Sequence, residues 1–182
     1  MTDPERYTRT AVTLHWLLAF AILASLTVGT VMSEMPLSPT RLKLINWHKW
    51  AGIAILVLSA ARLAWRLTHR PPALPASTPA WQARAASLTH AALYLAFFAV
   101  PLLGWAYSSA AGFPVVWFGL VPLPDFVPVD RDLAGQLKSA HQIAAWGLGA
   151  LVLLHVAAAL KHQWVDRDRL LSRMAWSTGG RR

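Results

Sequence analysis

The chain has 182 residues, of which 55% are hydrophobic and only 14% are charged, and its mean hydropathy is +0.40. This composition excludes an ordinary soluble domain and predicts a membrane protein with a single domain, residues 1–182. A net charge of +9 would suit a nucleic-acid-binding protein, but no basic motif with interleaved aromatic residues is present, so we expect no nucleic-acid partner. Cysteine is absent, which excludes disulfides, iron–sulfur clusters, thiolate metal sites and covalently attached haem.

The first apolar stretch, residues 10–33, contains no formally charged residue and is long enough to cross a bilayer as a helix. His15 lies near its start, and Gly29 lies fourteen residues later on the same helical face. A glycine there either leaves space for a large bound group or allows close helix packing. The stretch is longer than a signal-peptide core and no small-residue cleavage site follows, so we expect it to stay in the protein.

The second apolar stretch, residues 46–67, is interrupted only by three basic residues near its ends, whose long side chains can reach the headgroup region: Lys49, Arg62 and Arg66. His48 lies at its start, and Arg62 follows fourteen residues later on the same face. Two roles suit Arg62, contact with lipid headgroups or contact with the anionic edge of a cofactor.

The third apolar stretch, residues 85–109, follows a proline-rich segment, residues 70–79, that predicts a stiff linker. His90 lies near its start, where its ring would contact either a cofactor carboxylate or a neighbouring helix. Residues 112–129 are also apolar, but they contain four prolines and therefore cannot form a straight spanning helix. We expect this segment to be an outer loop on the membrane surface.

The last apolar stretch, residues 138–162, includes 22 consecutive positions without a formal charge, residues 139–160. This is enough for a membrane-spanning helix, yet it contains His141 and His155. The two are fourteen residues apart, so they share one face and lie about 21 Å apart along the axis. Polar groups at membrane depth are costly and usually functional.

Basic residues are distributed unevenly between the two sides of the predicted helices. Twelve of the 17 lie in the N-terminal segment, the connection 62–85 and the C-terminal tail, and five lie on the other side. The positive-inside rule therefore places both termini in the cytoplasm. We expect an all-α membrane protein, a bundle of four transmembrane helices over residues 10–33, 46–67, 85–109 and 138–162.

This topology sets the membrane depth of four histidines. His15 and His155 lie near the cytoplasmic face, and His48 and His141 lie near the outer face. A single histidine in a membrane helix would more simply form an interhelical hydrogen bond, but two depth-matched pairs favour axial ligation of two stacked b haems. A zinc site would need carboxylates or more histidines at each depth. A haem-free carrier is the remaining alternative.

Several short motifs resemble the bacterial cytochrome b561 family, and the similarity extends from about residue 7 to residue 174. The motifs are Thr-Leu-His-Trp at 13–16, Leu-Ile-Asn-Trp-His at 44–48, Ala-Arg-Leu-Ala-Trp-Arg at 61–66, Leu-Lys-Ser-Ala-His at 137–141 and Leu-His-Val-Ala-Ala-Ala-Leu-Lys-His at 154–162. The resemblance implies four transmembrane helices, two non-covalent b haems and electron transfer across the inner membrane. It also implies the same iron ligands, His15, His48, His141 and His155.

Some members of this family take electrons from superoxide outside the membrane and deliver them to ubiquinone. The resemblance therefore implies a superoxide:ubiquinone oxidoreductase. The family is also distantly related to cytochrome b subunits of hydrogenases. The alternative is thus a membrane-anchor subunit that relays electrons between quinone and a partner dehydrogenase or reductase, and purification with or without a partner would distinguish the two.

Four basic residues lie near the outer ends of the second and fourth predicted helices: Arg41, Lys43, Lys49 and Lys138. Their charge would attract a small anion such as superoxide, and the alternative is that they only bind lipid headgroups. Membrane lipid is an expected partner in either case.

Three further residues are candidates at the cytoplasmic side. His162 lies seven residues after His155 on the same face, where it would exchange protons with a quinone or be an ordinary interfacial histidine. His90 is a candidate for contact with a quinone or a haem propionate, and Arg62 for contact with a propionate. His69, in the basic linker, is expected to meet solvent.

Overall fold

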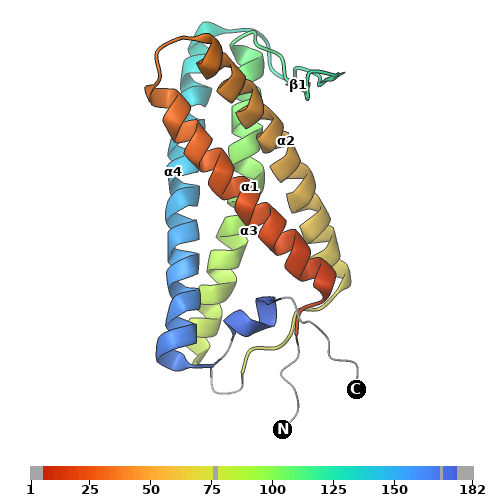
Figure 1. Ribbon diagram of the computed structural model, residues 1–182, viewed down its shortest axis with the longest axis vertical. Coiled ribbons are helices and arrows are strands. Elements are labelled where there is room, and N and C mark those ends of the chain that lie inside the picture. Colours follow the sequence, from red (N-terminus) through yellow and green to blue (C-terminus); the bar gives the residue numbers. More distant parts are fainter. Residues whose placement is uncertain (1–5, 76–77, 169, 176–182) are drawn as a thin grey trace.

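The computed structural model describes residues 6–75, 78–168 and 170–175, and four long helices dominate the fold (Figure 1). The helices are α1 (Arg9–Glu34), α2 (Pro39–Thr68), α3 (Ala80–Ala110) and α4 (Arg131–Lys161). Each is long and apolar enough to cross a membrane, which confirms the predicted all-α bundle. The start of α1 and the end of α4 lie at the same end of the bundle in Figure 1. We name this the inner end and the opposite one the outer end, after the expected orientation.

Two helices begin well before their apolar stretches because polar caps start them. Ser38 Oγ accepts a hydrogen bond from an N–H group of the first turn of α2 at 3.2 Å, and Pro39 supplies a φ suited to that turn. Asp130 Oδ1 accepts from two N–H groups of the first turn of α4, at 2.8 and 2.9 Å. Consequently α2 begins at residue 39 rather than 46, and α4 begins at residue 131 rather than 138.

The helices pack mainly in two pairs, α1 against α2 and α3 against α4. A buried apolar cluster lies between all four: Leu18, Ile22, Ile55, Leu93, Phe97, Val100 and Leu148. Large apolar side chains also cover the outside, for example Phe20, which is 75% exposed, and Leu95, which is 72% exposed. Such a surface would be unfavourable in water and suits contact with lipid.

The segment after α3 is an outer loop, as predicted, but it also forms a small hairpin that the sequence did not suggest (Figure 1). Strands β1 (Val116–Trp117) and β2 (Val121–Pro122) pair antiparallel. Residues 118–120 connect the strands, and the Leu120 N–H donates to the Trp117 carbonyl at 3.0 Å. Phe118 and Gly119, the central residues of this turn, both have positive φ, 52° and 71°, which is typical of hairpin turns.

Hydrogen bonds attach this hairpin to the outer part of α2. Trp50 Nε1 donates to the Val116 carbonyl at 2.7 Å, and Trp117 Nε1 donates to the Trp50 carbonyl at 3.2 Å. Lys49 Nζ donates to the Phe113 carbonyl at 3.0 Å. The hairpin is therefore held against the helix that carries His48.

The described part of the C-terminal tail crosses the inner end of the bundle (Figure 1). After α4 the chain forms a π-helical turn η1 (His162–Asp166) and a 3₁₀ helix η2 (Leu171–Met174). The Met174 carbonyl accepts a hydrogen bond from Trp16 Nε1 at 2.9 Å, and a guanidinium of η2 donates to the Ala73 carbonyl at 2.7 Å. This part of the tail therefore packs on α1 and on the linker after α2.

Candidate functional site

Each helix contributes two positions fourteen residues apart, and together these eight positions form two levels of the bundle. From α1 to α4, the inner level contains His15, Arg62, His90 and His155, and the outer level contains Gly29, His48, Gly104 and His141. Both levels hold facing imidazoles, but their other members differ in size and charge.

The outer level contains one pair of imidazoles, His48 and His141, whose ring centres are 6.0 Å apart. A bond between a metal ion and an imidazole nitrogen is about 2.0–2.1 Å long, so two imidazoles on opposite sides of one ion have ring centres about 6 Å apart. The observed separation therefore matches axial ligation of a single iron ion.

Backbone carbonyls select the tautomer of both outer histidines. His48 Nδ1 donates to the Ser25 carbonyl at 3.1 Å, and His141 Nδ1 donates to the Val100 carbonyl at 2.9 Å. A carbonyl only accepts, so each Nδ1 carries the proton and each Nε2 keeps a free lone pair. These bonds orient the rings in the way that metal-ligating histidines require. The interhelical hydrogen bond and the ligand role are thus compatible, because they use different nitrogens.

The two glycines of the outer level make room for these rings. A Cβ atom at Gly29 would lie 3.1 Å from Cε1 of His48, and one at Gly104 would lie 3.0 Å from Cε1 of His141. Either contact is closer than ordinary packing allows. Gly29 therefore permits α1 to approach the face of α2 that carries His48, which favours its packing role.

The inner level contains three imidazoles rather than two. The ring centre of His155 lies 6.2 Å from that of His15 and 5.6 Å from that of His90. Arg62 lies at the same level, and its Nη1 is 2.7 Å from His15 Nδ1. A guanidinium only donates, so His15 Nδ1 accepts this bond and the proton of the neutral ring is on Nε2. For His15 to ligate iron through Nε2, Arg62 has to move away from it.

Comparison with known proteins identifies the family of this chain. The model of the prokaryotic cytochrome b561 family matches residues 6–177. The chain belongs to the prokaryotic cytochrome b561 family. It is 32% identical to cytochrome b561 homolog 1 of Escherichia coli K12, with 93% of this chain and 97% of the relative aligned. It is 31% identical to the probable superoxide oxidase CybB of Yersinia pestis, over 93% of this chain and 96% of that protein.

A third relative, cytochrome b562 of Cereibacter sphaeroides, is 31% identical over 96% of this chain and 98% of its own length.

Membership of this family means that the protein is a multi-pass bacterial membrane protein that binds haem b and transfers electrons. The outer pair fits that cofactor in ring separation and tautomer, so His48 and His141 could hold it. At the inner level the ring separations also suit haem b, and a third imidazole is present.

The four basic residues predicted at the outer end lie at the outer parts of α2 and α4. Lys43 and Lys138 are exposed, whereas Arg41 and Lys49 are half-buried. The Lys49 ammonium is bonded to the Phe113 carbonyl and so takes part in holding the outer loop. Lys138 is thus the better placed of the two lysines nearest the outer pair to meet an approaching anion.

His162 lies in the first position of η1 with two carboxylates beside it. Its Nδ1 is 2.6 Å from Asp168 Oδ2 and 3.2 Å from Asp166 Oδ2. These three side chains each offer an atom that could bind a metal ion, within 4.8 Å of the others, but Lys161 Nζ already pairs with Asp166 at 2.5 Å.

His69, which was expected to meet solvent, is exposed. Its ring also stacks on that of Trp65, with ring centres 3.7 Å apart.

Proposed function

We propose that this protein carries electrons across the bacterial inner membrane through two b haems, with both termini in the cytoplasm. It takes the electrons from superoxide at the outer end and delivers them to ubiquinone, which makes it a superoxide:ubiquinone oxidoreductase. The observation that carries this proposal is the pair of levels, each with imidazole rings about the right distance apart for one iron ion.

In this proposal the outer haem is held by His48 and His141, and the inner one by His15 and His155. Bound haem supplies one-electron chemistry at each level. Carbonyl hydrogen bonds orient the two outer rings, and the apolar cluster between the levels excludes water from the middle of the bundle. At the inner level, Arg62 is placed to leave His15 and pair with a haem propionate.

The overall reaction balances with two superoxide ions per quinone. Each superoxide loses one electron and leaves as O₂, and ubiquinone gains two electrons and two protons to become ubiquinol. The likeness to the probable superoxide oxidase of Yersinia pestis supports superoxide as the donor, and so do the exposed Lys43 and Lys138 at the outer end. His162 and His90 are the proposed proton-exchanging or propionate-contacting groups at the inner end.

A spectroscopic titration of the purified protein tests this proposal. We expect two haems per chain by haem quantification, reduction of both by superoxide, and reoxidation by decylubiquinone. A chain with one haem or none would contradict the two-level assignment. Haems that superoxide leaves oxidised, but that a co-purified dehydrogenase or reductase reduces, would instead identify the electron-relay subunit of a larger complex.

A further inference from the structure

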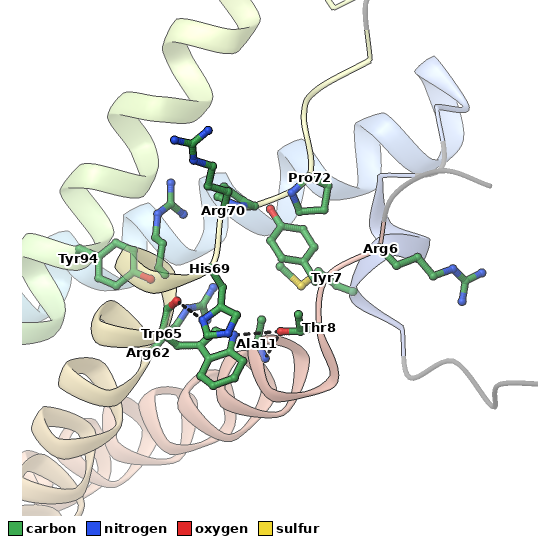
Figure 2. Close-up of a pocket in the computed structure, with 13 residues that line it drawn as sticks. Arg6, Tyr7, Thr8, Ala11, Arg62, Trp65, His69, Arg70, Pro72 and Tyr94 are labelled. Carbon is green, nitrogen blue, oxygen red and sulfur yellow. Dashed lines mark hydrogen bonds between the residues drawn. The ribbon is translucent and has the colours of Figure 1, made fainter. Parts of the chain in front are cut away.

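A cavity of about 300 Å³ opens at the inner end of the bundle, and we call it the arginine pocket (Figure 2). Its walls come from the residues before α1, the end of α2, the linker, α3 and η2. Four of its lining residues are arginines, Arg6, Arg62, Arg66 and Arg70. None of the 13 described residues that line it is acidic.

The positive charge of this pocket is not neutralised by the part of the chain that the structure describes. The ion pairs found among residues 6–75, 78–168 and 170–175 all lie at η1 and involve none of these arginines. Guanidinium groups that face a cavity without carboxylate partners can donate hydrogen bonds to oxygen atoms of a ligand. The pocket therefore suits a ligand with oxygen acceptors.

Part of the remaining wall is aromatic. The rings of Trp65 and His69 are stacked, 3.7 Å apart with an angle of 7° between their planes. Trp65 is fixed by a hydrogen bond from its Nε1 to Thr8 Oγ1 at 3.0 Å, and the Arg66 guanidinium lies 5.8 Å from the centre of the Tyr94 ring. An inorganic anion would use only the guanidinium groups. A flat ring with carbonyl oxygens at its edges would use both the aromatic walls and the cations.

The pocket is also directly connected to the inner level. Arg62 lines it and at the same time donates to His15 Nδ1 at 2.7 Å. A ligand in the pocket would thus be one side chain away from the inner imidazoles, and its head group would be near cytoplasmic water at the bundle end. Cationic donors around such a ligand would stabilise the negative charge that develops on its oxygens as electrons arrive.

We propose that the arginine pocket binds the head group of ubiquinone and is the site where it accepts electrons. This inference rests on the proposed function and locates its acceptor. At this site the quinone gains two electrons, one at a time from the inner haem, and two protons from water, and leaves as ubiquinol. His162 does not line the pocket, because its ring is held by Asp166 and Asp168 at η1.

The pocket could instead hold the carboxylates of the inner haem, which share the same oxygen chemistry, so the test has to separate the two. Arg70→Gln is the variant of choice because Arg70 lines the pocket and has no described contact with the inner histidines. Arg84→Gln is the matched control, since Arg84 lies on the exposed inner part of α3 and does not line the pocket. Arg62 is not used, because it contacts His15.

We expect Arg70→Gln to keep both haems, their spectra and their reduction by superoxide, while reoxidation by decylubiquinone slows about tenfold, as loss of one charged hydrogen bond predicts. Arg84→Gln should match the wild type. A photoreactive azido-ubiquinone should label residues 6–11 or 65–72 in the wild type, and the variant should show less labelling. This second readout does not depend on turnover.

Other outcomes would overturn the inference in recognisable ways. Loss or spectral change of the inner haem in Arg70→Gln would assign the pocket to haem carboxylates. Normal reoxidation and labelling elsewhere would place the quinone outside the pocket, and greater slowing in His162→Ala than in Arg70→Gln would place it at η1. Wild-type haems that decylubiquinone never reoxidises would contradict the proposed function itself.

Discussion

The two levels of the bundle share a ring separation near 6 Å but differ in what surrounds the rings. At the outer level, glycines flank the histidines and carbonyls accept a hydrogen bond from each Nδ1, so each Nε2 keeps its lone pair. At the inner level, His90 takes the place on α3 that Gly104 has at the outer level, and His15 takes that of Gly29 on α1. Arg62 takes the place on α2 that His48 has at the outer level. The outer level holds two imidazoles, whereas the inner level also contains a guanidinium and a third imidazole.

This difference agrees with the two halves of the proposed reaction. Oxidation of superoxide releases O₂ and requires no proton, so a site that only holds a haem is sufficient at the outer end. Reduction of a quinone requires two protons and stabilisation of negative charge, which need cationic and titratable groups. Those groups lie at the inner end, in Arg62, His90 and the arginine pocket. Variants of the two levels should therefore behave differently.

The largest effect is expected from removal of a histidine that has no substitute. His48→Ala and His141→Ala should each lose the outer haem and keep the inner one, so that haem per chain falls by about half. His155→Ala should lose the inner haem instead, since both other inner imidazoles face it. Pyridine haemochrome assay and the reduced-minus-oxidised spectrum measure this. Unchanged haem content in any of the three would remove that residue from the ligand set.

The inner level should tolerate one substitution that the outer level would not. In His15→Ala, the ring of His90 remains 5.6 Å from that of His155, close to the separation that one iron ion requires. We expect this variant to keep part of its inner haem with an altered spectrum, and the double variant His15→Ala/His90→Ala to lose it. If His15→Ala alone loses all inner haem, His90 cannot act as a ligand and its role is limited to contacts around the site.

A smaller effect is expected from crowding the outer rings. Gly104→Ala would place a Cβ 3.0 Å from Cε1 of His141, and overpacking of this kind costs about 1–3 kcal/mol. The variant should lose its outer haem more readily, measured by transfer to excess apomyoglobin, while the inner haem is unaffected. Gly147→Ala is the matched control, because a Cβ there meets nothing within 4 Å. Equal haem retention in both variants would show that His141 can shift without cost.

The sequence predicts the helices and the depth of the histidines well because both depend on local properties. Apolar runs mark the membrane spans, and the spacing of fourteen residues fixes which side chains share a face. The depth pairing of His48 with His141 and of His15 with His155 agrees with rings that the structure brings together. Their role as haem ligands stays a prediction.

What the sequence could not predict depends on contacts between distant segments. The outer hairpin is held by hydrogen bonds from Trp50 to Val116 and from Trp117 to Trp50, between positions separated by 66 and 67 residues in the chain. The arginine pocket needs the N-terminal segment, the linker, α3 and η2 to meet. The proximity of His90 to His155 follows from the packing of α3 on α4, which periodicity does not determine. The first turns of α2 and α4, which precede the apolar stretches, could have been predicted from the sequence, because Ser38 and Asp130 are typical N-cap residues. A prediction from hydropathy alone does not take such caps into account.

The smallest effect is expected at the outer surface, where single charges would steer superoxide. Lys138 is exposed and three residues before His141, so Lys138→Gln should lower the rate of haem reduction by superoxide about twofold at low salt and flatten its salt dependence. Lys49→Gln should have a mixed effect, because Lys49 also anchors the outer loop through the Phe113 carbonyl. Arg84→Gln removes the same charge at the inner end and should leave this rate unchanged.

Stopped-flow reduction at several ionic strengths separates steering from a general loss of function. A neutral electron donor should reduce the Lys138→Gln protein as fast as the wild type, since long-range attraction acts only on charged molecules. A wild-type rate that does not fall as salt rises would contradict steering, because screening must weaken any attraction between the basic outer end and an anion. In that case Arg41, Lys43, Lys49 and Lys138 would be assigned to lipid headgroups, and the asymmetry between the two levels would rest on the histidines, glycines and Arg62 alone.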